Sequence, residues 1–376
     1  MARRVLVLGN GLAGSEVQAV GLARRCLLKS SQSKTSNINF VRIPLTSKFV
    51  ERLPTFLHQQ LSTLTNDAYF GYNAATIQQT LDACQPDLIV GCGRSTVMLN
   101  RGIKRKNPSV TCVQILNPYI ASSNFDYVIF PRHDMNDAND VKGKFKAGSN
   151  VLPMTGSIHD KTLDVLAAAK ESYRGTHLSS LPSPRVTLLL GASHPRHCSY
   201  NIQQLETSVR NVVSCVQNQG GSVSIMGSRR TPKETMLRVR QILKDVGCPN
   251  FVWSPNEELQ LEQNGETENN PYVGVLAWSD GVFVTPDSIT MTSEAISSDP
   301  TLGVYVMLSS SPSGKFQRFF EELWARDNHH CEEAVLSALP NLTSASPCVR
   351  QLLKTNTAAA DKDLDKIVNT ITQGIQ

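Results

Sequence analysis

Short apolar runs alternate with segments of helical periodicity along nearly the whole chain. Runs such as DLIVGC (87–92) and DYVIFP (126–131) are apolar at almost every position, which is typical of parallel strands covered on both faces. In the first half the pattern predicts strands at 4–8, 38–43, 87–91, 110–115, 126–130 and 150–154, and helices at 14–28, 47–63, 73–84, 94–106 and 160–173. This alternation predicts a doubly wound α/β domain with a parallel sheet.

A second alternating series follows residues 175–184, whose small residues and two prolines predict a linker. Its expected strands lie at 185–193, which ends in a small-residue loop, and at 222–227, 251–254, 281–286 and 304–308, and its expected helices include 200–218 and a last one at 359–373. We therefore expect an α/β fold with two Rossmann-like doubly wound domains facing a cleft. The expected divisions are an N-terminal domain at 1–178, a C-terminal domain at 185–345 and a C-terminal helical tail at 346–376.

The first strand runs into Gly9, Gly11 and Gly14, which have the G-x-G-x-x-G spacing at a strand-to-helix turn. A dinucleotide site also needs an acidic residue at the end of the second strand, about 20 residues on, and residues 37–44 end without one. This argues against a dehydrogenase. Two interpretations remain: the glycines only make a tight turn and allow close packing, or the helix start contacts a phosphate. Glu16 complements the helix dipole but competes with a bound anion.

The composition is that of a globular protein in a reducing compartment. Of 376 residues 40% are hydrophobic and 18% charged, and the nine cysteines form no C-x-x-C pair, so we expect free thiols and no metal site. No apolar run approaches the ~18 residues of a membrane span, and the first strand starts too early for a removable presequence. The net charge of +5 suits anionic ligands or an anionic membrane face but lacks a nucleic-acid pattern. These features predict a cytosolic protein, alone or held at a membrane face by a partner.

Two further candidates follow strands of the first half. Arg94, in GCGRST, stands at a helix start, where a cation favours either an anionic ligand or an ion pair to another loop. His133 and Asp134, in PRHD, follow the strand at 126–130, and a histidine beside a carboxylate is a candidate general base. A structural cluster that ties loops together is the alternative.

The first two strands of the second half end in basic or small-residue loops. Ser193 opens a loop with His194, Arg196 and His197, which we interpret as anion-binding or simply solvated, since a zinc site lacks its remaining ligands. Arg229 and Arg230 precede a capped helix, an arrangement that suits a phosphate.

The segment TPDSITMTSEA (285–295) is the most distinctive of the chain. Asp287 or Ser288 is expected to cap a helix that starts at a strand end, and small hydroxyl side chains leave its N–H groups open to a ligand. Glu294 in the second turn is placed to accept hydrogen bonds from ribose hydroxyls. Plain capping and core packing is the alternative. The candidate nucleotide and phosphate contacts here are Thr285, Asp287, Ser288, Ser293 and Glu294.

Taken in order, several segments resemble the ELM family of mitochondrial fission proteins, named for elongated mitochondria. The matching stretches are GNGLAGSEVQAVGLAR, GCGRST, VQILNP, FDYVIFPRHD, TGSIH, SRRTP, NPYVGVLAWSDGVFVTPDSITMTSEA, VYVM and GKFQRF, spread over about 1–330. The chain departs from the family pattern at Val17, where Asn is usual, and at 117–119, where Pro-Arg is more usual.

The resemblance implies a GT-B-like fold, with a nucleotide-sugar site lined mainly by the second domain. It also implies a protein at the cytosolic face of the mitochondrial outer membrane that helps recruit a dynamin-related GTPase for fission. The alternative function is a glycosyltransferase that uses a UDP- or GDP-sugar and an unknown acceptor. In that case Glu294 would bind ribose, Arg229 or Arg230 the diphosphate, and His133 with Asp134 would act as the base, while Gly11 and Gly14 would close the site from the first domain.

Overall fold

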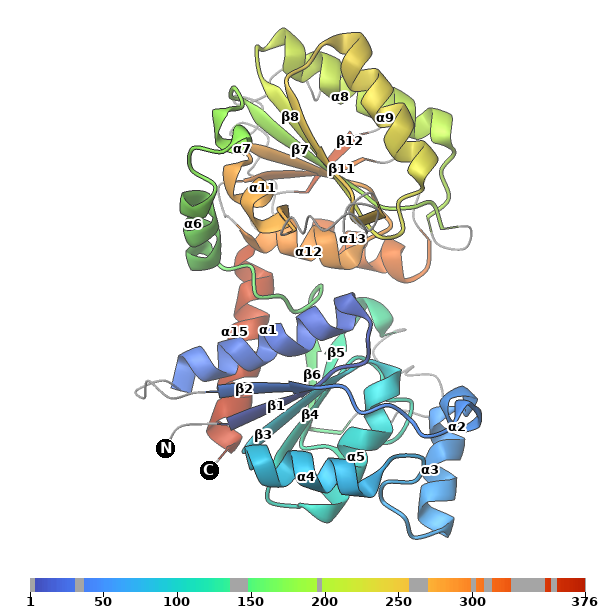
Figure 1. The fold of residues 1–376 in the computed structure, drawn as a ribbon. Coiled ribbons are helices and arrows are strands. Elements are labelled where there is room, and N and C mark those ends of the chain that lie inside the picture. The colour runs from blue at the N-terminus through green and yellow to red at the C-terminus, as the bar shows by residue number, and fades with distance from the viewer. Residues whose placement is uncertain are drawn as a thin grey trace. The chain divides into compact units, whose positions relative to one another are not determined.

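The computed structural model places the chain in two compact units, Met1–Asp160 with Ala360–Gln376 (unit 1) and Lys161–Ala359 (unit 2) (Figure 1). The predicted α/β class with two Rossmann-like sheets is confirmed. The structure describes residues 4–30, 37–135, 148–194, 198–256, 270–298, 302–307, 313–325, 349–352 and 357–375.

Unit 1 is built on a six-stranded parallel sheet with the order β2-β1-β3-β4-β5-β6. The strands are β1 (Arg4–Leu8), β2 (Asn37–Val41), β3 (Leu88–Cys92), β4 (Thr111–Ile115), β5 (Tyr127–Pro131) and β6 (Val151–Met154). The helices are α1 (Ala13–Ser30), α2 (Lys48–Arg52), α3 (Thr55–Leu64), α4 (Ala74–Cys84), α5 (Val97–Lys106) and α15 (Thr357–Gly374), with short turns η1 (Arg94–Thr96), η2 (Ser122–Asn124) and η3 (Arg132–Asp134).

Alternate residues of β1 enter two different cores, as the pleat of a strand requires. Val5 and Val7 pack with α1 and α15, whereas Leu6 and Leu8 pack with α4 and α5. All five residues of β3 and of β4 are buried. The sheet is thus covered on both faces, which is why these strands read as continuous apolar runs.

Unit 2 repeats this arrangement on a sheet with the order β12-β11-β10-β7-β8-β9, in which only β12 is antiparallel to its neighbour. Helices α8 and α9 cover one core cluster, and α11, α12 and α13 contribute to the other. The strands are β7 (Arg185–Leu190), β8 (Ser222–Gly227), β9 (Asn250–Trp253), β10 (Gly281–Val284), β11 (Gly303–Met307) and β12 (Val349–Leu352). The helices are α6 (Leu163–Ser172), α7 (His177–Ser180), α8 (Ile202–Asn218), α9 (Lys233–Val246), α11 (Tyr272–Trp278), α12 (Ile289–Ser298) and α13 (Lys315–Ala325).

The contacts divide the chain at different points from the expected boundaries. Helix α6, expected in the first domain, buries Leu166 with Val275 and Leu276 of unit 2. In the expected helical tail, Val349–Leu352 forms β12, and α15 buries apolar residues such as Leu364 in the core of unit 1. The predicted helix at 47–63 is two helices, α2 and α3, because Pro54 interrupts it.

Candidate functional site

The loop after β1 holds a carboxylate of its own. Glu16 Oε1 accepts hydrogen bonds from the N–H groups of Asn10 at 3.0 Å and Gly11 at 2.7 Å. Arg42 donates Nε to the same oxygen at 2.7 Å and Nη2 to Oε2 at 2.6 Å. The hydrogen bonds from Arg42 and the loop lower the Glu16 pKa from 4.5 to about 2. Two N–H groups of the glycine loop therefore face a fixed internal anion.

Two of the three loop glycines are required by geometry. A Cβ at Gly9 would collide with the Phe40 ring, and Gly11 has φ +78°, a conformation that side chains strain. A Cβ at Gly14 would meet nothing within 4 Å, so Gly14 does not bring α1 close to the sheet. The loop thus fits the tight-turn interpretation for Gly9 and Gly11 but not for Gly14.

Arg94 follows β3 and is bonded to a neighbouring helix end. Its Nη2 donates to the carbonyl of Leu53, the C-cap of α2, at 2.7 Å. Asn10, Ser15 and Arg94 also line a hollow of about 370 Å³ at the carboxyl ends of β1 and β3. The next two strands in the chain, β2 and β3, lie on opposite sides of β1. The hollow is therefore at the switch point of the sheet, the position at which open α/β sheets place ligands.

The PRHD segment forms the turn η3 and joins the C-terminal helix. Arg132 Nε lies 3.6 Å from Asp363 Oδ2 of α15, and that carboxylate also accepts from Thr155 N at 3.3 Å and Oγ1 at 3.0 Å. His133 is only 4% exposed, whereas Asp134 is half-buried. This geometry favours the structural interpretation, and the catalytic roles of His133 and Asp134 stay predictions.

In unit 2 the ends of β7, β8 and β10 meet around a second carboxylate. Asp287 Oδ2 accepts from Ala192 N at 3.0 Å and lies 3.0 Å from Arg230 Nη2. The Asp287 side chain has no exposed surface, and a Cβ at Gly191 would collide with it. Burial raises the Asp287 pKa, although hydrogen bonds and the Arg230 charge oppose the rise.

Thr285 and Thr231 support this cluster through the backbone. Thr285 Oγ1 accepts from Gly191 N at 2.7 Å, and Thr231 Oγ1 donates to Leu190 O at 2.6 Å. Thr231 does not cap α9, because its hydroxyl is bonded to the end of β7, and Pro232 is the N-cap. The structure therefore brings Arg230, Thr285 and Asp287 together.

The other predicted contacts of the β7 and β8 ends lie around this group. Ser193 Oγ accepts from Tyr200 N at 3.0 Å, so it closes its own loop. Arg229 is exposed, and its carbonyl accepts from Asn256 Nδ2 at 3.4 Å. Arg196 and His197 lie outside the described residues. Among the residues that the structure describes, no three His, Cys, Asp or Glu gather as metal ligands.

The helix α12 is capped by Ser288, whose Oγ accepts from Met291 N at 3.3 Å. Ser293 Oγ donates to Ile289 O at 2.8 Å within the same helix. Glu294 is only 6% exposed, and burial together with the nearby Glu294 carboxylate raises the pKa of Tyr272 well above its usual value. Ribose binding by Glu294 stays a prediction, and it would require the buried carboxylate to become accessible.

The sequence analysis did not single out Arg42, the partner of Glu16, or Tyr200, which lies near Asp287. Arg42 follows β2, the position at which a dinucleotide enzyme carries its acid, so the basic residue there was a usable signal. Tyr200 gave no such signal. Burial and the nearby Asp287 charge raise its pKa, and it lies ten residues beyond the end of β7.

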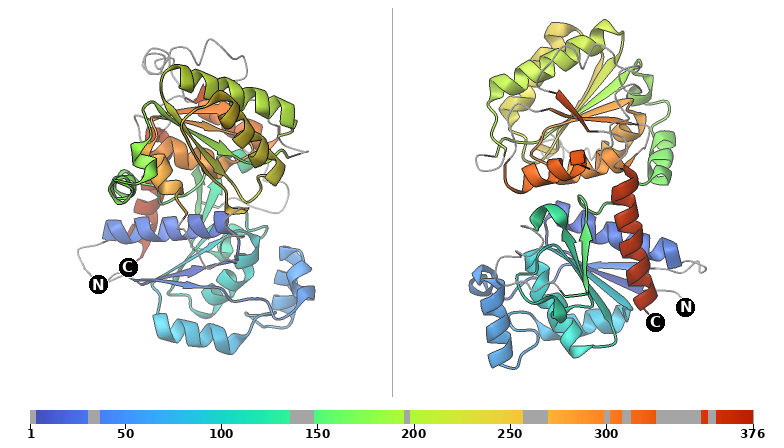
Figure 2. Two further views of the ribbon diagram at one scale, coloured as in Figure 1. Left: turned by 45° about the horizontal axis from the view of Figure 1, so that its top comes forward. Right: turned by 180° about the vertical axis from the view of Figure 1, so that it is seen from behind.

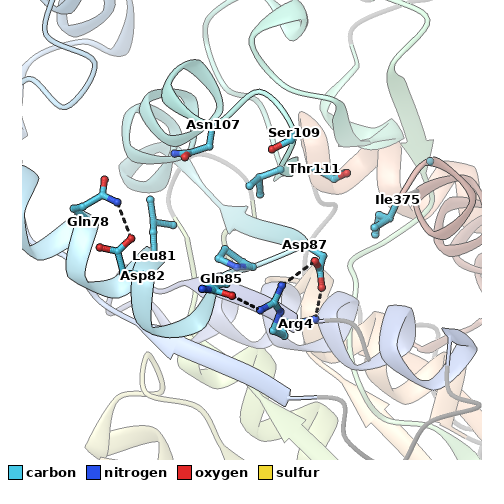
Figure 3. Close-up of a pocket in the computed structure, with 13 residues that line it drawn as sticks. Arg4, Gln78, Leu81, Asp82, Gln85, Asp87, Asn107, Ser109, Thr111 and Ile375 are labelled. Atoms are coloured by element: carbon cyan, nitrogen blue, oxygen red, sulfur yellow. Dashed lines mark hydrogen bonds and ion pairs between the residues drawn. The ribbon is translucent and has the colours of Figure 1, made fainter. Parts of the chain in front are cut away.

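A second hollow, of about 590 Å³, lies at the opposite edge of the unit 1 sheet, where β1, β3 and β4 begin (Figure 3). Arg4 there bonds Gln85 at 2.9 Å and lies 3.5 Å from Asp87. None of the predicted site residues lines this hollow. This hollow therefore does not bear on the predicted site residues, which stay predictions.

The chain matches the family model described as Mitochondrial fission ELM1 over residues 13–360. The mitochondrial fission protein ELM1 of Arabidopsis thaliana is 28% identical over 381 residues, covering 87% of this chain and 83% of that protein. An uncharacterized protein of Rickettsia prowazekii (strain Madrid E) is 26% identical over 345 residues, covering 85% of this chain and 87% of its own.

A crystal structure of a putative UDP-N-acetylglucosamine 2-epimerase from Listeria monocytogenes shares the fold, with a TM-score of 0.53 at 12% identity over 99% of this chain and 98% of that one. This likeness supports a GT-B-like fold. No helix in the described part of the chain is long and apolar enough to cross a membrane. The match over residues 13–360 spans almost the whole sequence, and the chain belongs to the mitochondrial fission ELM1 family.

Proposed function

We propose that this protein acts in mitochondrial division, at the cytosolic face of the outer membrane, by recruiting a dynamin-related GTPase. The observation that carries the proposal is the family match over residues 13–360, together with 28% identity to the plant fission protein. A GT-B-like scaffold supplies two α/β units with extensive surfaces for partners. Function then depends on surfaces and not on turnover.

The geometry of the strand ends supports a binding role over catalysis. The two carboxylates at these ends, Glu16 and Asp287, are each paired with an arginine of the same unit, Arg42 and Arg230. A phosphate placed at either position would have to displace or repel that carboxylate. The chain's own charges thus fill the positions at which a nucleotide enzyme would hold its ligand.

Depletion of the protein from the cells that express it tests this proposal. We expect mitochondria to elongate and the dynamin-related GTPase to disperse from them, and the full chain to restore both. As a control, the chain with Lys233→Gln, a substitution at an exposed position of α9, should restore both as the unchanged chain does. Unchanged mitochondrial length together with an unchanged GTPase distribution would contradict the proposal.

A second candidate function is binding or transfer of a nucleotide sugar. It is favoured by the fold shared with a putative UDP-N-acetylglucosamine 2-epimerase and by the start of α12 after the end of β10, where Ser288 caps the helix. In this role Ser288 at the start of α12 would face the diphosphate, and Glu294 the ribose.

Thermal unfolding with UDP, GDP and their sugars tests this candidate. A ligand at 100 times its dissociation constant adds about 2.7 kcal/mol to the free energy of unfolding. Binding in unit 2 predicts that Ser288→Ala weakens the stabilisation and that Gly14→Ala in unit 1 does not. A panel without any stabilising ligand would reject the candidate and leave the recruitment proposal standing.

A further inference from the structure

Helix α3 of unit 1 has the reverse of an ordinary surface helix's polarity. Its buried residues are all polar: Thr55, His58 and Ser62. Its exposed residues include Phe56, Leu57 and Leu64, the last of which is 82% exposed. A surface helix normally turns its apolar stripe toward the core.

The inner face of α3 is polar because it satisfies the loop behind it. His58 Nε2 lies 2.7 Å from the Phe70 carbonyl, and Ser62 Oγ donates to the Asp67 carbonyl at 2.6 Å. Arg101 of α5 donates to Ser62 Oγ at 3.4 Å. Rotating the helix to bury its leucines would break these buried bonds, so the apolar side is held outward.

Helix α2, which precedes α3 in the chain, adds an exposed aromatic side chain. Phe49 on α2 is 69% exposed. A crossover between parallel strands needs one helix, and α4 already connects to β3, so α2 and α3 are additional elements. They project together from one side of unit 1 in every view (Figures 1 and 2). We name Phe49, Phe56, Leu57 and Leu64 the α2–α3 face.

Basic side chains border the α2–α3 face. Lys48 and Arg52 flank Phe49, and Arg105 donates to Asn66 Oδ1 at 2.5 Å, two residues beyond Leu64. The bordering charges are three cations and two carboxylates, a net charge of +1: Lys48, Arg52 and Arg105 against Glu51 and Asp67. Aromatic and leucine side chains with a cationic border are typical of helices that lie in the headgroup region of an anionic bilayer.

We propose that the α2–α3 face is a membrane-docking surface that inserts into the headgroup region of an anionic phospholipid bilayer. The inference rests on the proposed function and deepens it, because it names the surface that holds the chain on the mitochondrial outer membrane. The face stands on the outer sides of the two helices. The 370 Å³ hollow that they border is lined from their inner sides, by residues such as Val50 and His58. The cationic border of the face complements the negative charge of an anionic bilayer, and this favours lipid as its occupant.

Sedimentation of the full chain with vesicles tests the surface. We expect binding to phosphatidylcholine vesicles that contain phosphatidylserine and much weaker binding to phosphatidylcholine alone. Phe49→Ser with Leu64→Ser should lower the partition coefficient at least about tenfold. Lys48→Gln with Arg52→Gln should lower it about twenty-fivefold on anionic vesicles only, since each cation near such a surface contributes roughly a factor of five.

The control variants lie on α9 of unit 2. Leu237 is 66% exposed and Lys233 is exposed, so Leu237→Ser with Lys233→Gln makes the same chemical changes elsewhere. We expect this pair to bind vesicles as the unchanged chain does, and all variants to keep its melting temperature.

Failure of the unchanged chain to bind anionic vesicles would overturn the inference, as would unaltered binding by the Phe49→Ser, Leu64→Ser variant. Attachment of the α2–α3 face to a purified dynamin-related GTPase without any vesicle binding would also overturn it, in favour of a protein partner. Absence of vesicle binding, with elongated mitochondria on depletion, would reject the surface but not the proposed function. Vesicle binding without a depletion phenotype would reject the function and keep the surface.

Discussion

Both units place a carboxylate–arginine pair at the carboxyl ends of their strands, but the two pairs differ in burial. Glu16 accepts from two loop N–H groups and two nitrogens of an exposed arginine, and its pKa falls to about 2. Asp287 is fully buried, and its pKa rises. The arginine pair and the loop therefore stabilise the ionised carboxylate of Glu16 in unit 1, whereas in unit 2 burial makes the ionised carboxylate of Asp287 unfavourable despite its arginine. The protonation state of Glu16 is thus fixed by its own hydrogen bonds, whereas that of Asp287 is sensitive to any charge that comes close to it.

The largest expected effect separates two neighbouring arginines of unit 2, Arg230 and Arg229. Arg230→Ala removes the charge beside buried Asp287 and should lower the free energy of unfolding by about 3 kcal/mol, at the lower end for a broken buried pair because Arg230 is half exposed. Arg229→Ala, next to it and exposed, should change it by less than about 0.5 kcal/mol. Denaturant unfolding measures both. Equal losses would contradict the buried pair.

A smaller loss is expected at the unit 1 pair. Glu16→Ala removes the acceptor for Asn10 and Gly11, and we expect a loss of about 1 kcal/mol because solvent can replace part of these bonds. Glu51→Ala, an exposed acid in the same unit, is the control. Denaturant unfolding of both variants decides, and an unaltered midpoint for Glu16→Ala would show that the carboxylate does not hold the loop.

The two carboxylates should give opposite pH dependences. The folded-state pKa of Glu16 is depressed, so its contribution is complete above about pH 5 and is lost as the pH falls from 4.5 toward 2. The folded-state pKa of Asp287 is raised, so its ionised form weakens the fold above its ordinary value of 3.8, and protonation relieves this as the pH falls. The stability of the unchanged chain should thus decline relative to Glu16→Gln on acidification and rise relative to Asp287→Asn. If both stability differences changed in the same direction with pH, the opposite pKa shifts of the two carboxylates would be contradicted.

The smallest effects concern the loop glycines. Gly11→Ala places a side chain at φ +78° and should cost about 1 kcal/mol. Gly14→Ala lies in the first turn of α1 with open space around it and should be neutral or gain up to about 0.5 kcal/mol. Melting temperatures of the two variants suffice. A larger loss at Gly14 would mean that it faces a crowded site after all.

The fold was largely predictable because each buried parallel strand carries its own apolar run. The ends of the chain were not, since pairing of 349–352 with β11 and packing of α15 on unit 1 are contacts distant in sequence. Thr285 and Asp287 could be recognised from local small and polar residues at a strand end. Their partner Arg230 was identified, but as a phosphate ligand, because sequence does not show that Asp287 already neutralises it.

His133 illustrates the same limit in unit 1. Its spacing to Asp134 resembles a catalytic pair, yet burial of the ring is set by how η3 packs, which no local pattern reports. The reversed polarity of α3 was missed for the opposite reason. The periodicity of 47–63 predicts a helix without saying that its apolar side faces outward.

Carbon NMR of the Glu16 carboxyl, assigned with Glu16→Gln, tests the central claim that the chain's own carboxylate fills the glycine loop. We expect a pKa of about 2 for this group and no change in its signal when pyrophosphate is added. A pKa near the ordinary 4.5, or a signal that moves as pyrophosphate binds, would contradict it.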